Sequence, residues 1–290
     1  MTQQNYLGIP EENSRYDSSP YVILPVPYEG SVTYGAGTAY GPNAIIEASR
    51  EVELFDDELG VESYKCGIHT LAPVETTSKG PEAQNEIIYK KYKPLLAAGK
   101  KVCMLGGEHS ISYAPVRACL EKYPQLTVLQ IDAHADLRDG YLGQKFSHAA
   151  VMRRIRDLTD KTVSVGIRNY SIEESDYIKS AQVKIISGRE VNANPNWVDD
   201  VVSLLSGDLY ITIDLDGFDP SLVPATGTPE PGGLLWYPTL ELLRKAVAKC
   251  NLVSFDVVEL APIEGYHAAD FLAAKLIYKI IGYDLLRGKK

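Results

Sequence analysis

The chain has 290 residues, 45% of them hydrophobic and 23% charged, and both values are ordinary for a soluble globular protein. Its 23 Gly, 17 Pro and four Cys exclude collagen-like, low-complexity and disulfide-scaffold proteins. A net charge of −9, from 29 Lys and Arg against 38 Asp and Glu, argues against nucleic acid and anionic membrane surfaces as partners.

Cysteine usage and the first residues bear on the cellular compartment. Cys66, Cys103, Cys119 and Cys250 are far apart and form no CxxC pair, which predicts free thiols in a reducing compartment. The first 19 residues lack the basic and apolar regions of a signal peptide, and no apolar window reaches the ~18 residues of a membrane span. These features predict a cytoplasmic protein.

Short apolar runs rich in Val and Ile alternate with amphipathic segments along nearly the whole chain. Several of these runs lack polar alternation, which indicates strands covered on both faces. The runs of strand length are 21–27, 66–71, 101–106, 126–132, 162–167, 182–187, 208–214 and 251–258.

Helical patterns lie between these runs. They are 82–99, 147–158, 196–207, 238–250 and 267–286, and a further helix is expected after the GAGTAYG segment at 35–41. Alternating strands and helices predict an α/β protein with helices on both faces of a sheet. We therefore expect one domain over 1–290, with 1–19 as an N-terminal extension. Its architecture is three-layer α/β/α around a mostly parallel sheet of about eight strands.

Acidic and histidine side chains gather where three of the expected strands end. Asp132, His134 and Asp136 follow one strand at i, i+2 and i+4, a spacing that projects all three to one side of an extended chain. Asp214 and Asp216 repeat the i, i+2 spacing after another strand. His109 follows the strand at 101–106. The carboxyl ends of strands are where ligands bind in open α/β sheets, so these residues are expected to form one site.

The composition of this group predicts a metal centre. Carboxylates placed this close repel one another unless a cation holds them. Four carboxylates and two imidazoles, with no thiolate, suit a hard or borderline ion such as Mn²⁺ better than a structural zinc. The four negative charges balance two divalent ions, an arrangement that activates a bridging water.

Other motifs give weaker signals. GAGTAYG has the spacing GxGxxxG and not the GxGxxG of a dinucleotide-binding loop. The sequence contains no GxxxxGK[ST] motif and no GxSxG elbow, so nucleotide binding and covalent acyl chemistry are not expected.

Four blocks of sequence resemble the signature blocks of the ureohydrolase family, which contains arginases, agmatinases and related guanidino hydrolases. They are GGEHS, DAHAD, ITIDLDGFDPSLVPATGTPEPGGL and SFDVVELAP, and the segment PVPYEGSVTYGAGTAYGPNAI is similar to agmatinase-type members. The resemblance runs from about residue 20 to the end. It implies an arginase-like fold, two Mn²⁺ per subunit and a homo-oligomer, either a trimer or a hexamer.

The resemblance also implies roles for individual residues. The metal ligands would be His109, Asp132, His134, Asp136, Asp214 and Asp216. A metal-bridging hydroxide would attack the guanidinium carbon, Asp136 would take its proton, and His148 would protonate the leaving amine. Glu259 would pair with the substrate guanidinium, and Thr228 would contact the substrate. Asp219 would contact the metal ligands without binding the ions itself.

Departures from the family pattern bear on the substrate. The family more often has Asp at the position of Glu108 and Gly at that of Ala149. The segment LRDGYLGQKFS lacks the Asn and Ser-Gly-Asn pattern with which arginases hold the carboxylate of arginine. This absence favours agmatine, which has no such carboxylate, as the substrate. The products would be urea and putrescine, a polyamine precursor. Aminopropylagmatine, guanidinobutyrate (through Arg138), arginine and guanidine stay open as substrates. An inactive metal-binding scaffold is the alternative from another class.

Overall fold

A single eight-stranded sheet forms the middle of the molecule, in a computed structural model that describes residues 5–288. Every neighbouring pair of strands is parallel, and the order is β2-β1-β3-β8-β7-β4-β5-β6. The strands are β1 (Tyr21–Val26), β2 (Ile68–Thr70), β3 (Lys101–Gly106), β4 (Thr127–Ile131), β5 (Thr162–Ile167), β6 (Lys184–Ser187), β7 (Asp208–Asp214) and β8 (Asn251–Val258). The predicted α/β fold with about eight mostly parallel strands is confirmed, and the sheet is parallel throughout.

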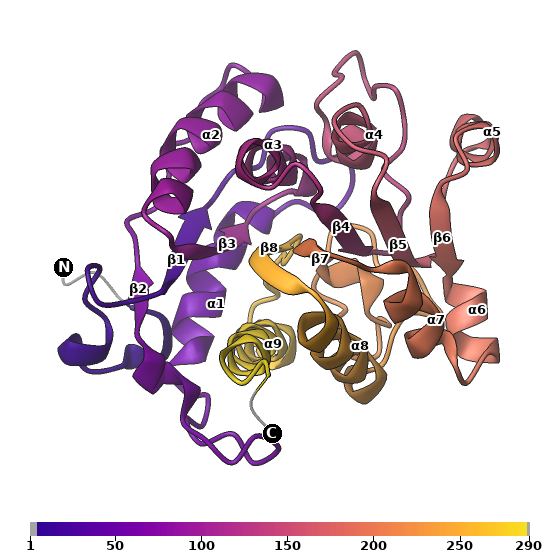
Figure 1. Ribbon diagram of the computed structural model, residues 1–290. Helices are drawn as coiled ribbons and strands as arrows, with labels where there is room; N and C mark the ends of the chain where they lie inside the picture. Colours follow the sequence, from indigo (N-terminus) through magenta and orange to yellow (C-terminus); the bar gives the residue numbers. More distant parts are fainter. Residues whose placement is uncertain (1–4, 289–290) are drawn as a thin grey trace.

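Helices cover both faces of this sheet, as Figure 1 shows. One face carries α2 (Pro81–Ala97), α3 (Tyr113–Lys122), α4 (Val151–Arg156) and α5 (Ile172–Ser180). The other carries α1 (Gly41–Ser49), α6 (Gly188–Ala193), α7 (Trp197–Leu204), α8 (Trp236–Lys249) and α9 (Ala268–Leu285). Short 3₁₀ turns η5 (His109–Ser112), η6 (His148–Ala150) and η7 (Leu215–Gly217) follow strands or precede helices near the sheet's carboxyl edge.

Successive residues of the strands point to opposite faces of the sheet and belong to two separate hydrophobic clusters. In β1, Tyr21 and Ile23 belong to the cluster under α1, α8 and α9, whereas Val22 and Leu24 belong to the cluster under α2 and α3. All six residues of β1 are buried. This burial on both faces explains why the strands read as continuous apolar runs in the sequence.

The described part of the predicted N-terminal extension packs against the domain. Tyr6 is fully buried, and its hydroxyl donates to the carbonyl oxygen of Ala274 at 2.6 Å. Leu7 and Ile9 lie in the same hydrophobic cluster. Residues 1–4 of the extension and residues 289–290 lie outside the described part of the chain. Within 5–288, none of the helices is long and apolar enough to cross a lipid bilayer.

Candidate metal centre and active site

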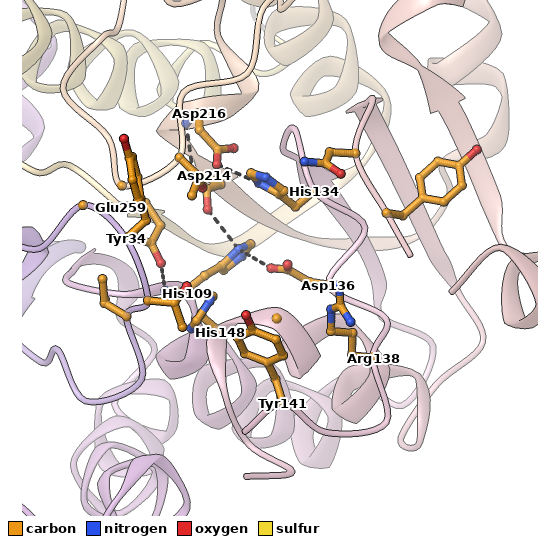
Figure 2. Close-up of a pocket in the computed structure, with 18 of the residues that line it drawn as sticks. Tyr34, His109, His134, Asp136, Arg138, Tyr141, His148, Asp214, Asp216 and Glu259 are labelled. Carbon is orange, nitrogen blue, oxygen red and sulfur yellow. Dashed lines mark hydrogen bonds and ion pairs between the residues drawn. The ribbon is translucent and has the colours of Figure 1, made fainter. Parts of the chain in front are cut away.

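The side chains singled out in the sequence come together at the carboxyl ends of four adjacent strands. His109 follows β3, the DAHAD segment follows β4, Asp214 ends β7, and Glu259 follows β8. These four strands are consecutive neighbours in the sheet, in the order β3-β8-β7-β4. Their ends surround one cavity of about 170 Å³, lined in part by His109, His134, Asp136, Asp214, Asp216 and Glu259 (Figure 2).

His109 lies at the centre of a first group of carboxylates. Its Nδ1 is 3.1 Å from Asp132 Oδ2, 3.0 Å from Asp136 Oδ2 and 3.3 Å from Asp214 Oδ2. The same Nδ1 is buried and has no hydrogen-bond partner of proper geometry. A buried nitrogen that faces three carboxylates without a hydrogen-bond partner is suited to bind a metal ion.

The other ring nitrogen of His109 determines that Nδ1 is the nitrogen available to bind an ion. Nε2 lies 2.9 Å from Thr212 Oγ1, and that hydroxyl donates to Asp256 Oδ1 at 2.6 Å. Because the only proton of the hydroxyl goes to Asp256, Thr212 can only accept from His109, which places the imidazole proton on Nε2. The Ser112 hydroxyl is a more distant acceptor for Thr212, at 3.4 Å. Nδ1 therefore presents a lone pair to the carboxylates, where a cation is required.

A second group of ligands shares Asp132 with the first. His134 Nδ1 is 2.9 Å from Asp216 Oδ2 and 3.8 Å from Asp132 Oδ1. The two groups that can each hold an ion are His109, Asp132 and Asp214, and Asp132, His134 and Asp216, with ligand atoms within 4.8 Å of one another. Asp132 is fully buried, and Gln130 Nε2 donates to its Oδ2 at 2.7 Å. Asp132 thus belongs to both groups, and together their donor atoms fit two divalent ions.

The pKa values of two site residues indicate that the site attracts positive charge. Burial, together with the charges of Asp136 and Asp216, raises the pKa of Asp132 to about 7. Burial lowers the pKa of His134, but the hydrogen bond and charge of Asp216 outweigh it and raise that pKa to about 11. Asp132 and His134 therefore hold protons more tightly than usual when no other cation is present, and divalent ions would displace those protons on binding.

Two of the predicted site residues occupy backbone conformations that L-amino acids rarely adopt. Asp136 has φ 53° and Glu259 has φ 65°. A non-glycine residue in this region costs about 1–3 kcal/mol and persists where the surroundings fix it. The carboxylate of Glu259 is held because its Oε1 accepts from the backbone N–H of His109 at 2.6 Å. Both residues line the cavity.

His148 reaches the same cavity from the loop after β4. Its ring is half-buried, contacts Tyr141 edge to face with centroids 5.8 Å apart, and places Nδ1 3.0 Å from Ser31 Oγ. In Figure 2, His148 and Tyr141 lie across His109 from the Asp214 and Asp216 carboxylates. His148 and the candidate metal ligands therefore face one another across the cavity.

The remaining predicted residues have different surroundings. Thr228 lines the cavity, and so does Arg138, whose Nε is 3.8 Å from Glu174 Oε2. Asp219 instead binds its own loop: its carboxylate accepts from the Ser221 N–H and hydroxyl and from the N–H groups of Gly232 and Gly233. These bonds hold the segment after β7 in place, and none of them reaches a metal ligand.

The GAGTAYG segment, which resembles a dinucleotide loop only loosely, forms one wall of the cavity. The Gly35 N–H donates to the Gly227 carbonyl oxygen at 3.2 Å, and a Cβ on Gly35 would come within 2.7 Å of that oxygen. A Cβ on Gly41 would come within 2.6 Å of the Leu260 carbonyl oxygen. The glycines therefore allow the GAGTAYG segment to pack closely against the loops after β7 and β8. This packing accounts for both glycines without a phosphate-binding role.

Sequence reasoning did not identify several lining residues, including Tyr34, Tyr141, Asn169, Tyr170 and Glu174. They come from three separate segments of the chain, around residues 34, 141 and 169–174, and only Glu174, in α5, carried a local signal. It occupies the third position of a Ser-x-x-Glu capping box that begins α5 with Ser171.

Comparison with known proteins gives consistent matches over nearly the whole chain. The model of the arginase family matches residues 19–282. An N(1)-aminopropylagmatine ureohydrolase from Synechocystis is 38% identical over 94% of this chain and 92% of the relative, and an agmatinase from Pyrococcus horikoshii is 31% identical over 90% and 91%. The crystal structure of agmatine ureohydrolase of Thermoplasma volcanium superimposes with a TM-score of 0.89 at 30% identity, covering 98% of this chain and 95% of that one.

Proposed function

The chain belongs to the arginase family, and from this premise we propose that it is a binuclear-manganese ureohydrolase that converts agmatine to urea and putrescine. The reaction is hydrolysis of a C–N bond in a linear amidine. One observation carries the proposal. The residues of two candidate ion-binding groups lie at the same cavity as the Glu259 carboxylate and the His148 imidazole.

We propose that the six predicted ligands, His109, Asp132, His134, Asp136, Asp214 and Asp216, hold two Mn²⁺ ions. Support comes from the shared Asp132, from the unpaired His109 Nδ1, and from a donor set of carboxylates and imidazoles without thiolate. When bound, the two ions supply Lewis-acid activation and a hydroxide nucleophile at neutral pH.

Glu259 is proposed to bind the guanidinium of the substrate. Burial raises the pKa of Glu259 well above its ordinary value, so a cationic guanidinium would stabilise the ionised carboxylate through a charge-assisted pair. The His109 N–H fixes Oε1, which orients the carboxylate and with it the plane of the guanidinium. Thr228 is proposed as a further substrate contact in the same cavity.

Proton transfer is assigned to Asp136 and His148. Asp136 accepts the proton of the nucleophile, and His148 donates a proton to the nitrogen of the leaving amine as the C–N bond breaks. A diamine leaving group is strongly basic, so it departs readily only when protonated. His148→Ala is therefore expected to lower kcat by about 10²- to 10⁴-fold with metal content unchanged.

N(1)-aminopropylagmatine is a second candidate substrate, which two observations favour. Relatives with that activity in their names are 38% and 35% identical to this chain over 94% of its length. The cavity lining includes the tyrosines Tyr34 and Tyr170, 84% and 48% exposed, whose aromatic faces suit the second ammonium group of a longer polyamine.

A panel of guanidino compounds tests these assignments. Urea release from agmatine, aminopropylagmatine, guanidinobutyrate, arginine and guanidine is measured with Mn²⁺-loaded protein and expressed as kcat/KM. We expect agmatine or its aminopropyl derivative to exceed the other three. A preference for guanidinobutyrate would point to Arg138 as a carboxylate-binding residue. Two bound ions without urea from any of the compounds would instead indicate an inactive scaffold.

We further propose that the protein is a cytoplasmic homo-oligomer, either a trimer or a hexamer. Residues 1–290 of each subunit would form one hydrolase domain, with residues 1–19 as an N-terminal extension. The product putrescine would enter polyamine biosynthesis. Free thiols on all four cysteines support the reducing compartment. Light scattering of the purified protein measures the subunit number.

A further inference from the structure

A buried carboxylate and a serine outside the predicted site are linked to His148 by hydrogen bonds. The side chain of Glu108 is fully buried. Its Oε2 accepts from the backbone N–H groups of Gly30 at 2.7 Å and Ser31 at 2.6 Å. Its Oε1 accepts from the hydroxyls of Ser31 at 2.7 Å and Ser110 at 2.5 Å. The carboxylate therefore fixes the loop that carries Ser31 and also fixes the direction of the Ser31 hydroxyl.

The Ser31 hydroxyl then determines which nitrogen of His148 carries a proton. Its single proton goes to Glu108, and its oxygen accepts from the backbone N–H of His148 at 3.1 Å. The remaining neighbour of that oxygen is His148 Nδ1 at 3.0 Å. Because the hydroxyl has no second proton to donate, Nδ1 has to be the donor of this bond.

We propose that Glu108 and Ser31 are positioning residues that hold His148 in the tautomer protonated on Nδ1, with Nε2 turned to the cavity. This inference rests on the proposed function, because it concerns the residue assigned as its proton donor. The bond from Nδ1 to Ser31 exists both in the imidazolium and in the neutral ring left after Nε2 gives up its proton. The ring therefore keeps its orientation through the transfer.

The isosteric variant Glu108→Gln tests the direction of the hydrogen bonds. Its amide oxygen can still accept from the N–H groups of Gly30 and Ser31, and its NH₂ group then donates to the hydroxyls of Ser31 and Ser110. The Ser31 proton is released to His148 Nδ1, so the neutral ring should carry its proton on Nε2. The nitrogen NMR signals of the ring report this directly, since the chain has only five histidines and His148→Ala identifies the relevant pair.

The NMR measurement uses protein labelled with ¹⁵N-histidine and loaded with a diamagnetic divalent ion. We expect the Nδ1–H form in the natural chain and a shift to the Nε2–H form in Glu108→Gln. An Nε2–H form in the natural chain, or no change in the variant, would overturn the proposal, whatever the protein does to guanidino compounds.

A double-mutant cycle tests whether Ser31 acts through the His148 ring. Ser31→Ala is expected to lower kcat by about three- to tenfold with KM within about twofold, the size of one lost hydrogen bond. The His148→Ala chain keeps the hydrogen bond from the backbone N–H of residue 148 to Ser31, so comparing the two backgrounds removes the effect of that bond from the result. In the His148→Ala background, Ser31→Ala should change kcat by less than about 1.5-fold.

The outcomes separate this inference from the proposed function. If His148→Ala lowers kcat and Ser31→Ala lowers it equally in both backgrounds, the proposed linkage is wrong while the function stands. If the NMR tautomer changes as expected but His148→Ala has no effect on kcat, the positioning is correct and the assignment of the proton donor is wrong.

Discussion

Removing the hydroxyl of Thr212 should weaken metal binding although Thr212 contacts no ion in the proposed site. The hydroxyl bridges two buried groups, His109 Nε2 at 2.9 Å and Asp256 Oδ1 at 2.6 Å. In Thr212→Val both groups lose this partner, at about 1–3 kcal/mol each, so we expect the free energy of unfolding to fall by roughly 2–6 kcal/mol. The imidazole also loses the bond that keeps its proton off Nδ1, which should weaken Mn²⁺ binding by about 10- to 100-fold.

The assay compares Thr212→Val with Thr212→Ser, which keeps the hydroxyl and loses only a methyl group. Urea-induced unfolding in metal-free buffer gives the stability, and calorimetric titration with Mn²⁺ gives the affinity. Thr212→Ser should bind Mn²⁺ nearly as tightly as the natural chain. If Thr212→Val also binds Mn²⁺ with the natural affinity, the reasoning about the His109 tautomer is refuted.

Three further predictions concern other parts of the site. Glu259→Gln removes the charge that pairs with the guanidinium, so kcat/KM for agmatine should fall by about 30-fold or more while the metal content measured by mass spectrometry stays constant; an unchanged kcat/KM would contradict the role of Glu259. Asp214→Ala should lose metal and activity together, and a fully active metal-free variant would contradict the mechanism. The loop bonds of Asp219, first that from the Ser221 hydroxyl, lower its pKa to about 2. Because the folded pKa lies below the unfolded value of ~3.9, this stabilisation is complete above about pH 4 and is lost as the pH falls toward 2. Asp219→Asn should therefore lower the free energy of unfolding by about 1–2 kcal/mol at pH 7, and the difference from the natural chain should shrink below pH 4; a pH-independent difference would argue against this role.

Most strands were predictable because they are buried on both faces and therefore form apolar runs between polar segments, although the edge strand β6 is only partly buried. The strand order was not, since it depends on which crossovers pass over which face, and no short segment encodes that. Helix α3 was not among the predicted helices, although Pro115 lies in its first turn, where proline is tolerated. Helices α5 and α6 escaped although Ser171 and Ser187 begin capping boxes with Glu174 and Glu190, a signal that the sequence does contain.

The candidate ligands could be predicted because the i, i+2 spacing after a strand is local, whereas their supporting contacts are not. Thr212 and Asp256 are paired across β7 and β8, which the sequence does not reveal to be neighbours. Ser31 and His148 are 117 residues apart. Glu108 stood out in the sequence only as a departure from the family pattern, and its contact with Ser31 becomes visible only once the loop after β1 is placed over the end of β3.

The most direct test of the account is the number of Mn²⁺ ions bound per chain in the natural protein and in Asp132→Ala. Asp132 belongs to both ion-binding groups, so the account predicts two ions per chain for the natural protein, and loss of both ions together with urea release for the variant. Two retained ions in Asp132→Ala, or full urea release by metal-free natural protein, would contradict it.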